Sequence, residues 1–261
     1  MKKITVSKAI GEALHEEMLR DDKVFIMGED MAVMGNVFAI TKGFLEEFGP
    51  KRVIDTPISE EGFVGMAVGA AMRGMRPVVE LMYDDFATEC ADPLFNQAAK
   101  IRYMTGGQCH VPMVLRAPMG AGRRNAGQHS QSLENFFCHF PGLKVVAPCT
   151  AQDAKGLLKS AIRDDDPVIF LEHKLLYAHK EQIPEEEYTI PLGQADIKRE
   201  GKDITIITWS REVNFSLEAA KTLAEQGIDA EVLDLRTLVP LDWDAIVQSV
   251  SKTHNAIIVS E

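Results

Sequence analysis

The hydrophobic positions of the chain alternate between the spacing of helices and that of buried strands. In "SKAIGEALHEEMLRD" apolar residues recur at helical spacing behind Ser7, which we expect to cap a helix. The run "KVFIM" follows and is typical of a strand. The same alternation continues to residue 171. It predicts an α/β fold in which crossover helices cover both faces of a parallel sheet.

The pattern fails between residues 172 and 202, where the sequence is charged, irregular and interrupted by proline. Such a segment is typical of a connection between domains. The alternation then restarts, with strands expected in "DITIITWS", "IDAEVLDL" and "NAIIVSE" and two helices between them. We therefore predict a first domain over residues 1–171, a connecting segment over 172–202 and the start of a second α/β domain over 203–261.

The second domain is predicted to be incomplete. Three parallel strands and two helices would leave one face and one edge of its sheet poorly covered. We expect either that the natural chain continues past Glu261 or that a partner covers the gap.

Composition narrows the class of protein. With 46% hydrophobic residues among 261, the chain can bury a large core. The 28 basic and 39 acidic side chains give a net charge of −11, which argues against nucleic acid or an anionic membrane as the main partner. No segment has the apolar length of a membrane span, and the N-terminus lacks the features of a signal peptide, so we expect a cytoplasmic protein. Four cysteines without Cys-x-x-Cys spacing indicate reduced thiols.

Two adjacent acids in "IDTPISEEGFVG" raise the first question of chemistry. One interpretation is structural: Ser59 caps the helix that follows, and Glu60 and Glu61 in its first turn meet the positive end of the helix dipole. The glycines at 62, 65, 69 and 74 support another interpretation, because glycine inside a helix costs about 1 kcal/mol relative to alanine and close packing must compensate. We expect this helix to be deeply buried. An acid at the N-terminus of this helix would be partly desolvated, which raises its pKa and lets it carry a proton near neutral pH. Glu60 is therefore either a cap or an acid-base group.

A second candidate lies in "RAPMGAGRRNAGQHSQSLENFF", a long glycine-rich loop after an apolar strand. Loops at the carboxyl ends of parallel strands are where α/β proteins build their sites. Glycine allows the backbone to approach a ligand closely. His129 in this loop is therefore either a solvated side chain or a functional one, and Arg123 and Arg124 are solvated loop charges unless they join it.

Several long stretches together resemble one family. They are "DTPISEEGFVGMAVGAAMRGMRPVVELMYDDF", "NQAAKIRYMTGG", "QHSQSLENFF" and "PGLKVVAPCTAQDAKGLLKSAIRDDDPVIFLEHKLLY". They are similar to the beta subunit of the decarboxylating component of 2-oxo acid dehydrogenase complexes, a group that includes pyruvate, branched-chain 2-oxo acid and acetoin dehydrogenases. The resemblance covers essentially the whole chain. It implies a parallel-sheet pyrimidine-binding domain and a C-terminal α/β domain of the transketolase type, an α2β2 heterotetramer, thiamine diphosphate as cofactor, and family chains that extend past residue 261.

The resemblance also implies roles for individual residues. Glu60 matches the glutamate that hydrogen-bonds the aminopyrimidine ring of the cofactor and so promotes loss of the proton from the thiazolium carbon. Glu61 keeps the capping role. Phe86 in "ELMYDDF" matches the aromatic residue that stacks on the aminopyrimidine, although without the family it would be interpreted as a core residue. Glu29 matches an acidic position near the cofactor, with a turn-forming role, shared with Asp30, as the alternative.

Two further roles are implied outside the pyrimidine pocket. His129 matches the family histidine that hydrogen-bonds the reaction intermediate and takes part in acyl transfer to a lipoyl group. In "SAIRDDDP" the family holds a potassium ion, which would involve Ala161, Asp164 and Asp166. Three acids before a proline also make an ordinary turn.

The chain lacks the Gly-Asp-Gly segment through which thiamine diphosphate enzymes hold magnesium. In the heterotetrameric family these oxygen ligands lie on the alpha subunit, so the resemblance implies that this chain is half of an active site. Its expected partners are the alpha subunit and the lipoyl acyltransferase of the complex. The motifs "ELMYDDF" and "GAGRRNAGQHSQSL" favour acetoin somewhat over pyruvate dehydrogenase. The alternatives are a branched-chain 2-oxo acid dehydrogenase beta subunit, a fragment similar to transketolase or deoxyxylulose-phosphate synthase, and a noncatalytic α/β module that scaffolds a complex or binds a nucleotide.

Overall fold

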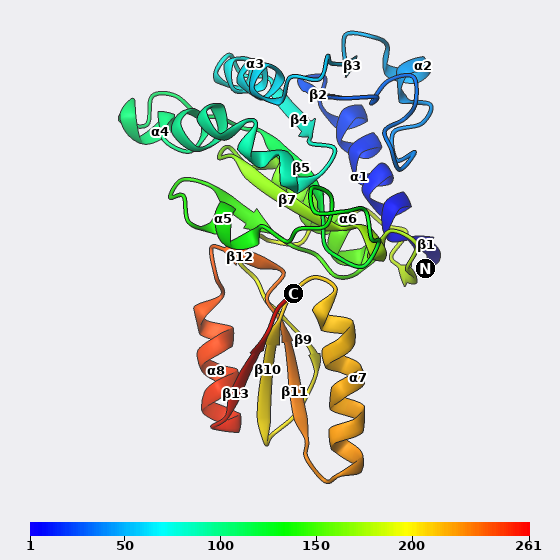
Figure 1. Ribbon diagram of the computed structural model, residues 1–261, viewed down its shortest axis with the longest axis vertical. Coiled ribbons are helices and arrows are strands. Elements are labelled where there is room, and N and C mark those ends of the chain that lie inside the picture. The colour runs from blue at the N-terminus through cyan, green and yellow to red at the C-terminus, as the bar shows by residue number, and fades with distance from the viewer.

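Alternating apolar strands and amphipathic helices build two α/β units in the computed structural model, which describes residues 1–261 (Figure 1). The strands of the larger sheet are β2 (Val24–Gly28), β3 (Val53–Asp55), β4 (Arg76–Glu80), β5 (Val114–Met119), β6 (Lys144–Val146), β7 (Val168–His173) and β12 (Thr237–Val239). Their order across the sheet is β12-β6-β7-β5-β4-β2-β3. All neighbours are parallel except β12, which runs antiparallel to β6.

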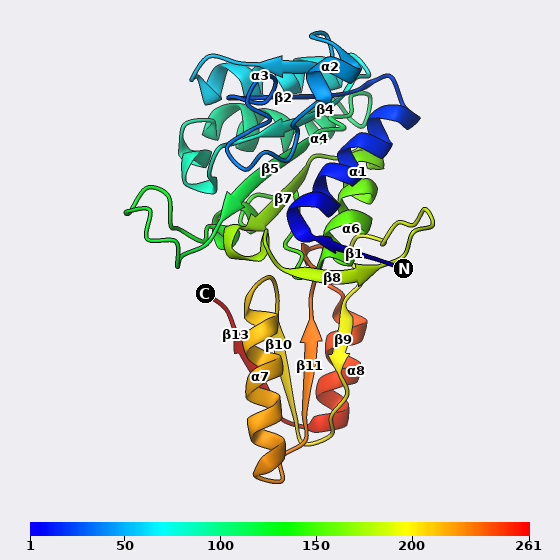
Figure 2. The same cartoon turned by 90° about the vertical axis from the view of Figure 1, so that its right-hand side faces the viewer.

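Helices cover both faces of this sheet, as the sequence predicts. Helices α1 (Val6–Arg20) and α6 (Ala151–Arg163) bury one apolar core with α2 (Phe44–Phe48). The other core lies under α3 (Glu60–Met72), the π-helix η2 (Asp92–Ala98), α4 (Ile101–Met104) and α5 (Glu134–Cys138). Figures 1 and 2 show α1 and α6 together on one side, away from α3 and α4. Because both faces are covered, every residue of β5 and β7 is buried.

Some local expectations are wrong. The first helix begins at Val6, so its cap is Thr5, whose hydroxyl accepts the Lys8 N–H at 3.2 Å, and Ser7 lies inside the first turn. The sequence "DFATECADPLFNQAAKIRYM" (residues 85–104) predicts one helix, but the structure has part of a 3-10 helix η1 (Asp84–Thr88) there, followed by η2 and α4. Pro93 at the start of η2 has no N–H to continue a helix from the preceding turn.

The segment 172–202 is also less irregular than the sequence indicates. It contains the 3-10 helix η3 (Lys174–Leu176) and two strands, β8 (Lys180–Ile183) and β9 (Asp196–Arg199). Strand β8 pairs with the N-terminal strand β1 (Lys2–Thr5), and β9 pairs antiparallel with β11 in the smaller sheet. These pairings join residues far apart in the chain, so no local pattern announces them.

The smaller sheet has the order β13-β10-β11-β9 and lies below the larger one in Figure 1. Its other elements are β10 (Ile204–Thr208), α7 (Glu212–Glu225), β11 (Ala230–Asp234), α8 (Trp243–Thr253) and β13 (Ala256–Val259). The parallel pairing of β10 with β11 and β13 confirms the predicted strands. The expectation that one face is poorly covered is wrong, because α7 packs on the face of Ile206 and α8 on the face of Ile207. Strand β13 lies at the sheet edge, with Ile257 and Ile258 exposed.

Strand β12 connects the two units. We assigned these residues by sequence to the second domain, but the strand extends the larger sheet, where Thr237 pairs with Val146 and Val239 with Val145. The N–H of Ala147 also donates to the carbonyl of Arg236 at 2.9 Å. None of the helices is long and apolar enough to span a membrane.

Candidate functional site

The carboxyl edge of the larger sheet brings four of the predicted residues into one cavity. Strand β2 ends directly before Glu29, and Glu60 begins α3 shortly after the end of β3. Phe86 lies in η1 after β4, and His129 in the loop after β5. The cavity has a volume of about 530 Å³ and is lined by Glu29, Ile58, Ser59, Glu60, Glu61, Met82, Phe86, Glu89 and His129. Ile58, Met82 and Glu89 were not predicted, although each follows a strand end or neighbours a predicted residue.

Glu60 and Glu61 differ in their surroundings. Glu60 is buried at the first position of α3, whereas Glu61 is exposed. The expected capping hydrogen bond from Ser59 is absent. Its hydroxyl instead packs beside Gly62, where an added Cβ would meet the Ser59 Oγ at 2.8 Å. The N-terminus of the helix therefore presents Glu60 to the cavity.

Glu29 has an unsatisfied oxygen. Its Oε1 is buried and has no hydrogen-bond partner. Burial raises the pKa of Glu29, and the negative charges of Glu60 and then Asp30 raise it further. A buried polar atom without a partner costs on the order of 1–3 kcal/mol, which a ligand donor would recover. This oxygen, the Glu60 carboxylate and the Phe86 ring in the wall fit a heterocycle such as an aminopyrimidine.

His129 is packed among aromatic rings. Its centroid lies 4.3 Å from that of Tyr83 at an interplanar angle of 62°, and 5.5 Å from that of Phe86 at 84°. Tyr83 was missed by the sequence analysis, but it stands in the same "ELMYDDF" motif that identified Phe86. A second cavity of about 360 Å³ shares Phe86 and Glu89 and extends to Gln128 and Phe136. Phe86 thus lies in the wall between these two adjoining cavities.

Helix α3 is not deeply buried, which corrects the sequence-based expectation. Its apolar side packs into the core through Phe63, Val64, Ala67, Val68 and Ala71. Its other side is exposed and consists of Gly62, Met66, Gly69 and Met72. No atom lies within 4 Å of a Cβ built at Gly69, whereas a Cβ at Gly65 would meet Pro93 at 3.8 Å, so the exposed Gly69 has no packing partner within this chain. We call this exposed side the glycine face.

A buried ionic layer joins β4, β5 and β7. Arg116 in β5 is fully buried and donates from Nε and Nη2 to the Glu172 carboxylate at 2.6 and 2.8 Å, and also binds Glu80. The Tyr177 hydroxyl donates to Glu172 at 2.7 Å, and the Asn36 amide donates to Glu80 at 2.9 and 2.8 Å. Burial raises the pKa of Glu80 despite the nearby guanidinium. Removing one partner of such a layer would leave a buried charge unpaired, which is strongly destabilising, so the layer fixes these three strands to one another.

Ala161, Asp164 and Asp166 lie at the opposite edge, before β7. The Arg76 guanidinium donates to the carbonyls of Ile162 and Asp164 at 3.1 and 2.8 Å. The Asp164 carboxylate accepts from Lys144 at 2.8 and 2.7 Å. Asp166 pairs with Arg102 and, at 3.4 Å, with Lys144, and the Ala161 carbonyl accepts the Asp164 N–H at 3.3 Å. These oxygens are satisfied by groups of the chain itself and do not fit an additional potassium ion.

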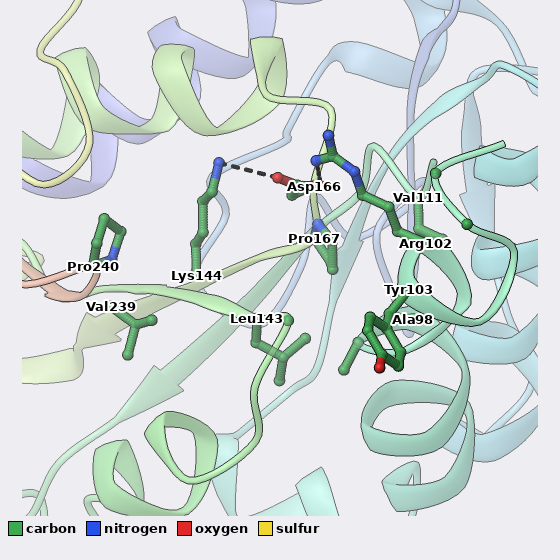
Figure 3. A pocket seen from close by; sticks show the side chains of 14 residues that line it. Ala98, Arg102, Tyr103, Val111, Leu143, Lys144, Asp166, Pro167, Val239 and Pro240 are labelled. Carbon is green, nitrogen blue, oxygen red and sulfur yellow. Dashed lines mark hydrogen bonds and ion pairs between the residues drawn. The ribbon is translucent and has the colours of Figure 1, made fainter. Parts of the chain in front are cut away.

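A larger cavity of about 680 Å³ adjoins this cluster (Figure 3). Figure 3 shows Lys144 and Arg102 both directed at Asp166, while Val111, Leu143 and Val239 form apolar walls. Its charges pair with one another, and it contains none of the four residues of the cofactor-type cavity. The smaller cavity at the carboxyl edge is therefore the candidate active site. No group of three or more histidine, cysteine, aspartate or glutamate side chains in the chain is arranged to hold a metal ion.

Both α/β units of the chain match domains of known protein families. Residues 2–180 match the pyrimidine binding domain of transketolase, and residues 193–261 match the transketolase C-terminal domain. The chain is 54% identical to the pyruvate dehydrogenase E1 component subunit beta of Rickettsia felis, over 99% of this chain and 79% of that protein. It is 50% identical to the acetoin:2,6-dichlorophenolindophenol oxidoreductase subunit beta of Cupriavidus necator, over 100% and 80%. It is 49% identical to the 2-oxoisovalerate dehydrogenase subunit beta of Bacillus subtilis, over 97% and 78%.

A solved structure described as a split gene transketolase, inactive beta4 tetramer, superimposes with a TM-score of 0.81 at 23% identity. The superposition covers 99% of this chain and 80% of that one. At this level of identity the likeness shows a common fold.

Proposed function

Because the chain belongs to the family of E1 beta subunits, which carry the pyrimidine-binding and C-terminal domains of transketolase, we propose that it supplies the pyrimidine side of a thiamine diphosphate site. The observation that carries the proposal is the meeting of Glu29, Glu60, Phe86 and His129 around one cavity. A noncatalytic scaffold would have no need of this combination.

We assign each residue of the cavity a separate role in cofactor binding or proton transfer. Glu60 holds a proton at the ring nitrogen of the aminopyrimidine, and Glu29 offers its unpaired oxygen to a donor of the same ring. Phe86 provides a flat apolar surface that fixes the ring without competing for its hydrogen bonds. Thiamine diphosphate, when bound, supplies the nucleophilic carbon and the electron sink for carbon-carbon cleavage. His129, which packs against Phe86, would donate a proton to the lipoyl sulfur that is released when the S–S bond breaks and the other sulfur takes the acyl group.

The proposed partner at this site is an alpha subunit that brings the magnesium ligands. The glycine face supports this, because Gly69 is exposed and leaves room for the close approach of another backbone on the helix that Glu60 begins. Met66 is 61% and Ile58 85% exposed, which is apolar surface that a partner would cover. We further propose an α2β2 assembly that delivers acyl groups to a lipoyl acyltransferase in the cytoplasm.

For the substrate we propose pyruvate or acetoin. Relatives of both kinds are 50 to 54% identical to this chain, and a 2-oxoisovalerate relative at 49% keeps branched-chain 2-oxo acids as the second candidate. The alpha subunit shares the pocket, so the choice belongs to the assembled enzyme.

The test is reconstitution with an alpha subunit. Calorimetry should detect weak thiamine diphosphate binding by the chain alone and tight, magnesium-dependent binding by the heterotetramer. The assembled enzyme is then assayed with pyruvate, acetoin and 3-methyl-2-oxobutanoate. Micromolar binding by the isolated chain would contradict the half-site proposal and would require magnesium ligands among the acids of this chain. An assembly that forms but never binds the cofactor would indicate a scaffold.

A further inference from the structure

We infer that Lys174 is a positioning residue that holds His129 in place for acyl transfer, an inference that rests on the proposed function of His129. Lys174 begins η3 directly after β7 and is 3% exposed. Its Nζ donates to the main-chain carbonyl of His129 at 2.9 Å. It therefore crosses from the rigid sheet to the glycine-rich loop.

The same ammonium group faces the ring on which His129 packs. The Lys174 Nζ lies over the Tyr83 ring, 5.1 Å from its centroid. The Tyr83 ring in turn packs edge-on against the His129 imidazole, with centroids 4.3 Å apart. Lys174 thus contacts both supports of His129, its main chain and its aromatic neighbour.

The position of Lys174 is costly for fold stability alone. A buried ammonium normally needs a carboxylate partner, yet no carboxylate lies within ion-pair distance of Lys174; Asp84 and Asp85 act on it from farther away. Burial lowers the pKa of Lys174, and these two acids oppose that effect. The single hydrogen bond from its ammonium goes to His129 rather than to a carboxylate.

The acids anchor the loop just beyond His129. Asp84 Oδ2 accepts the Leu133 N–H at 3.0 Å, and Asp85 Oδ1 accepts from the Gln131 side chain at 2.7 Å. The loop ends also meet Glu261 of the second unit, which accepts from the Ala121 N–H at 3.2 Å and the Ser132 hydroxyl at 2.8 Å.

The middle of the loop is held much less. Arg123 and Arg124 are exposed, and a Cβ built at Gly127 would meet no atom within 4 Å. Anchoring therefore concentrates on His129 and the residues that follow it. The glycine-rich part has a cation–π contact from Arg123 to Phe38, at 5.6 Å from the ring centroid, whereas the hydrogen-bonded part begins again at His129, where Lys174 makes the first contact.

The first test compares variants of the holoenzyme. Lys174→Met keeps the apolar stem and removes the donor, whereas Lys174→Arg keeps a donor; Lys180→Met is the control, because Lys180 is exposed in β8. Lys174→Met should lower the kcat of reductive acylation of a lipoyl domain by about 10- to 100-fold, the cost of a small misplacement of a reacting group. The KM for the lipoyl domain and proton exchange at the thiazolium carbon should stay near parental values. Lys174→Arg should restore part of the loss, and Lys180→Met should have no effect.

A double-mutant cycle shows whether Lys174 acts through His129. If it does, adding Lys174→Met to His129→Ala lowers acylation no further than His129→Ala alone. Additive losses would overturn the inference. Lys174→Gln, which stays polar but is too short to reach the carbonyl from the same position, gives the same comparison should the methionine variant fold poorly.

A second measurement needs no activity. In the isolated chain with labelled histidines, the imidazole NMR signals of His129 should shift and broaden in Lys174→Met, and trypsin should cleave faster after Arg123 and Arg124, while Lys180→Met matches the parent. Unchanged signals and unchanged cleavage would contradict the positioning role. If these signals change but His129→Ala has parental acylation, the positioning inference stands and the proposed role of His129 is wrong.

Discussion

Glu60 and Glu61 are neighbours in sequence but differ in burial, and this difference is the basis of a prediction. Glu60→Gln should leave folding nearly intact and slow proton exchange at the thiazolium carbon by orders of magnitude, because an amide cannot relay the proton. The measurement is hydrogen-deuterium exchange of the bound cofactor in the heterotetramer.

The matched control is Glu61→Gln. This change should alter the free energy of unfolding by roughly 0.3–1 kcal/mol through the helix dipole and leave the exchange rate unchanged. Parental exchange in the Glu60 variant would reduce Glu60 to a first-turn acid of α3.

Asp84 provides a prediction about pH. Burial raises the pKa of Asp84 from an unperturbed 3.8 to about 8, and the negative charge of Asp85 also raises it. The hydrogen bond from the Leu133 N–H and the positive charge of Lys174 lower the pKa and offset part of this shift. Between pH 3.8 and about 8, the Asp84 carboxyl group is protonated in the folded chain but ionised in the unfolded chain. The contribution of Asp84 to the free energy of unfolding is therefore complete below pH 3.8 and is lost as pH rises to about 8.

Asp84→Asn keeps an acceptor for the Leu133 N–H and removes this titration. The stability of the variant relative to the parent should increase with pH up to about 8 and then level off. Urea unfolding across this range measures the difference. A difference that does not change with pH would mean that Asp84 is ionised in the folded chain throughout.

At the residue level, the sequence predicted the residues of the candidate site better than the residues that hold them in position. The residues alone left Glu60 and His129 with two interpretations each, and only the family resemblance assigned Phe86 to the same site; all three line one cavity. The contact between Lys174 and His129 could not be anticipated, because it joins positions far apart in sequence through a backbone carbonyl. The opposite-edge acids were assigned by motif alone, and only the positions of Arg76, Lys144 and Arg102 show how their oxygens are satisfied.

At the level of elements, one substitution in α3 should have opposite effects on the stability of the isolated chain and on its assembly with an alpha subunit. Because no atom surrounds a Cβ at Gly69, Gly69→Leu should be tolerated by the isolated chain and should raise its stability by a few tenths to about 1 kcal/mol through helix propensity. The same side chain should block the close approach of an alpha subunit. Thermal unfolding measures the first effect and size-exclusion chromatography of the mixed subunits the second.

The control for α3 is Ala219→Leu, a small-to-large change at an exposed position of α7. It should leave assembly intact. Normal heterotetramer formation by Gly69→Leu would remove the glycine face from the proposed interface.

Element prediction succeeded where a helix or strand is specified by its own pattern. Strand β5 and helix α6 carry continuous or periodic apolar residues and were anticipated. Strands β8, β9 and β12 are short, partly polar and defined by distant partners, so their local sequence is uninformative. The glycines of α3 predicted deep burial, which is wrong for this chain; close packing of Gly69 against a partner subunit stays a prediction.

For the whole molecule, β12 predicts that the first unit is incomplete without residues of the second. A fragment of residues 1–202 would leave the outer edge of β6 unpaired. Its Ala147 amide, which donates to Arg236 in the intact chain, should lose protection in hydrogen exchange, while amides of the central strand β5 remain protected. Equal protection of Ala147 in fragment and intact chain would mean that β12 contributes little to the sheet.

The same strand bears on how the protein is made. On the ribosome, β6 emerges long before β12, and synthesis of the stretch from Val146 to Thr237 takes roughly 5 to 20 s at about 5–20 residues per second. During that interval the nascent chain presents a strand edge with free N–H and C=O groups, which is a template for pairing with other chains. The larger sheet is closed on this side only when Thr237 and Val239 arrive, so we expect a nascent chain that ends before Thr237 to be more prone to mispairing along β6 than the full chain.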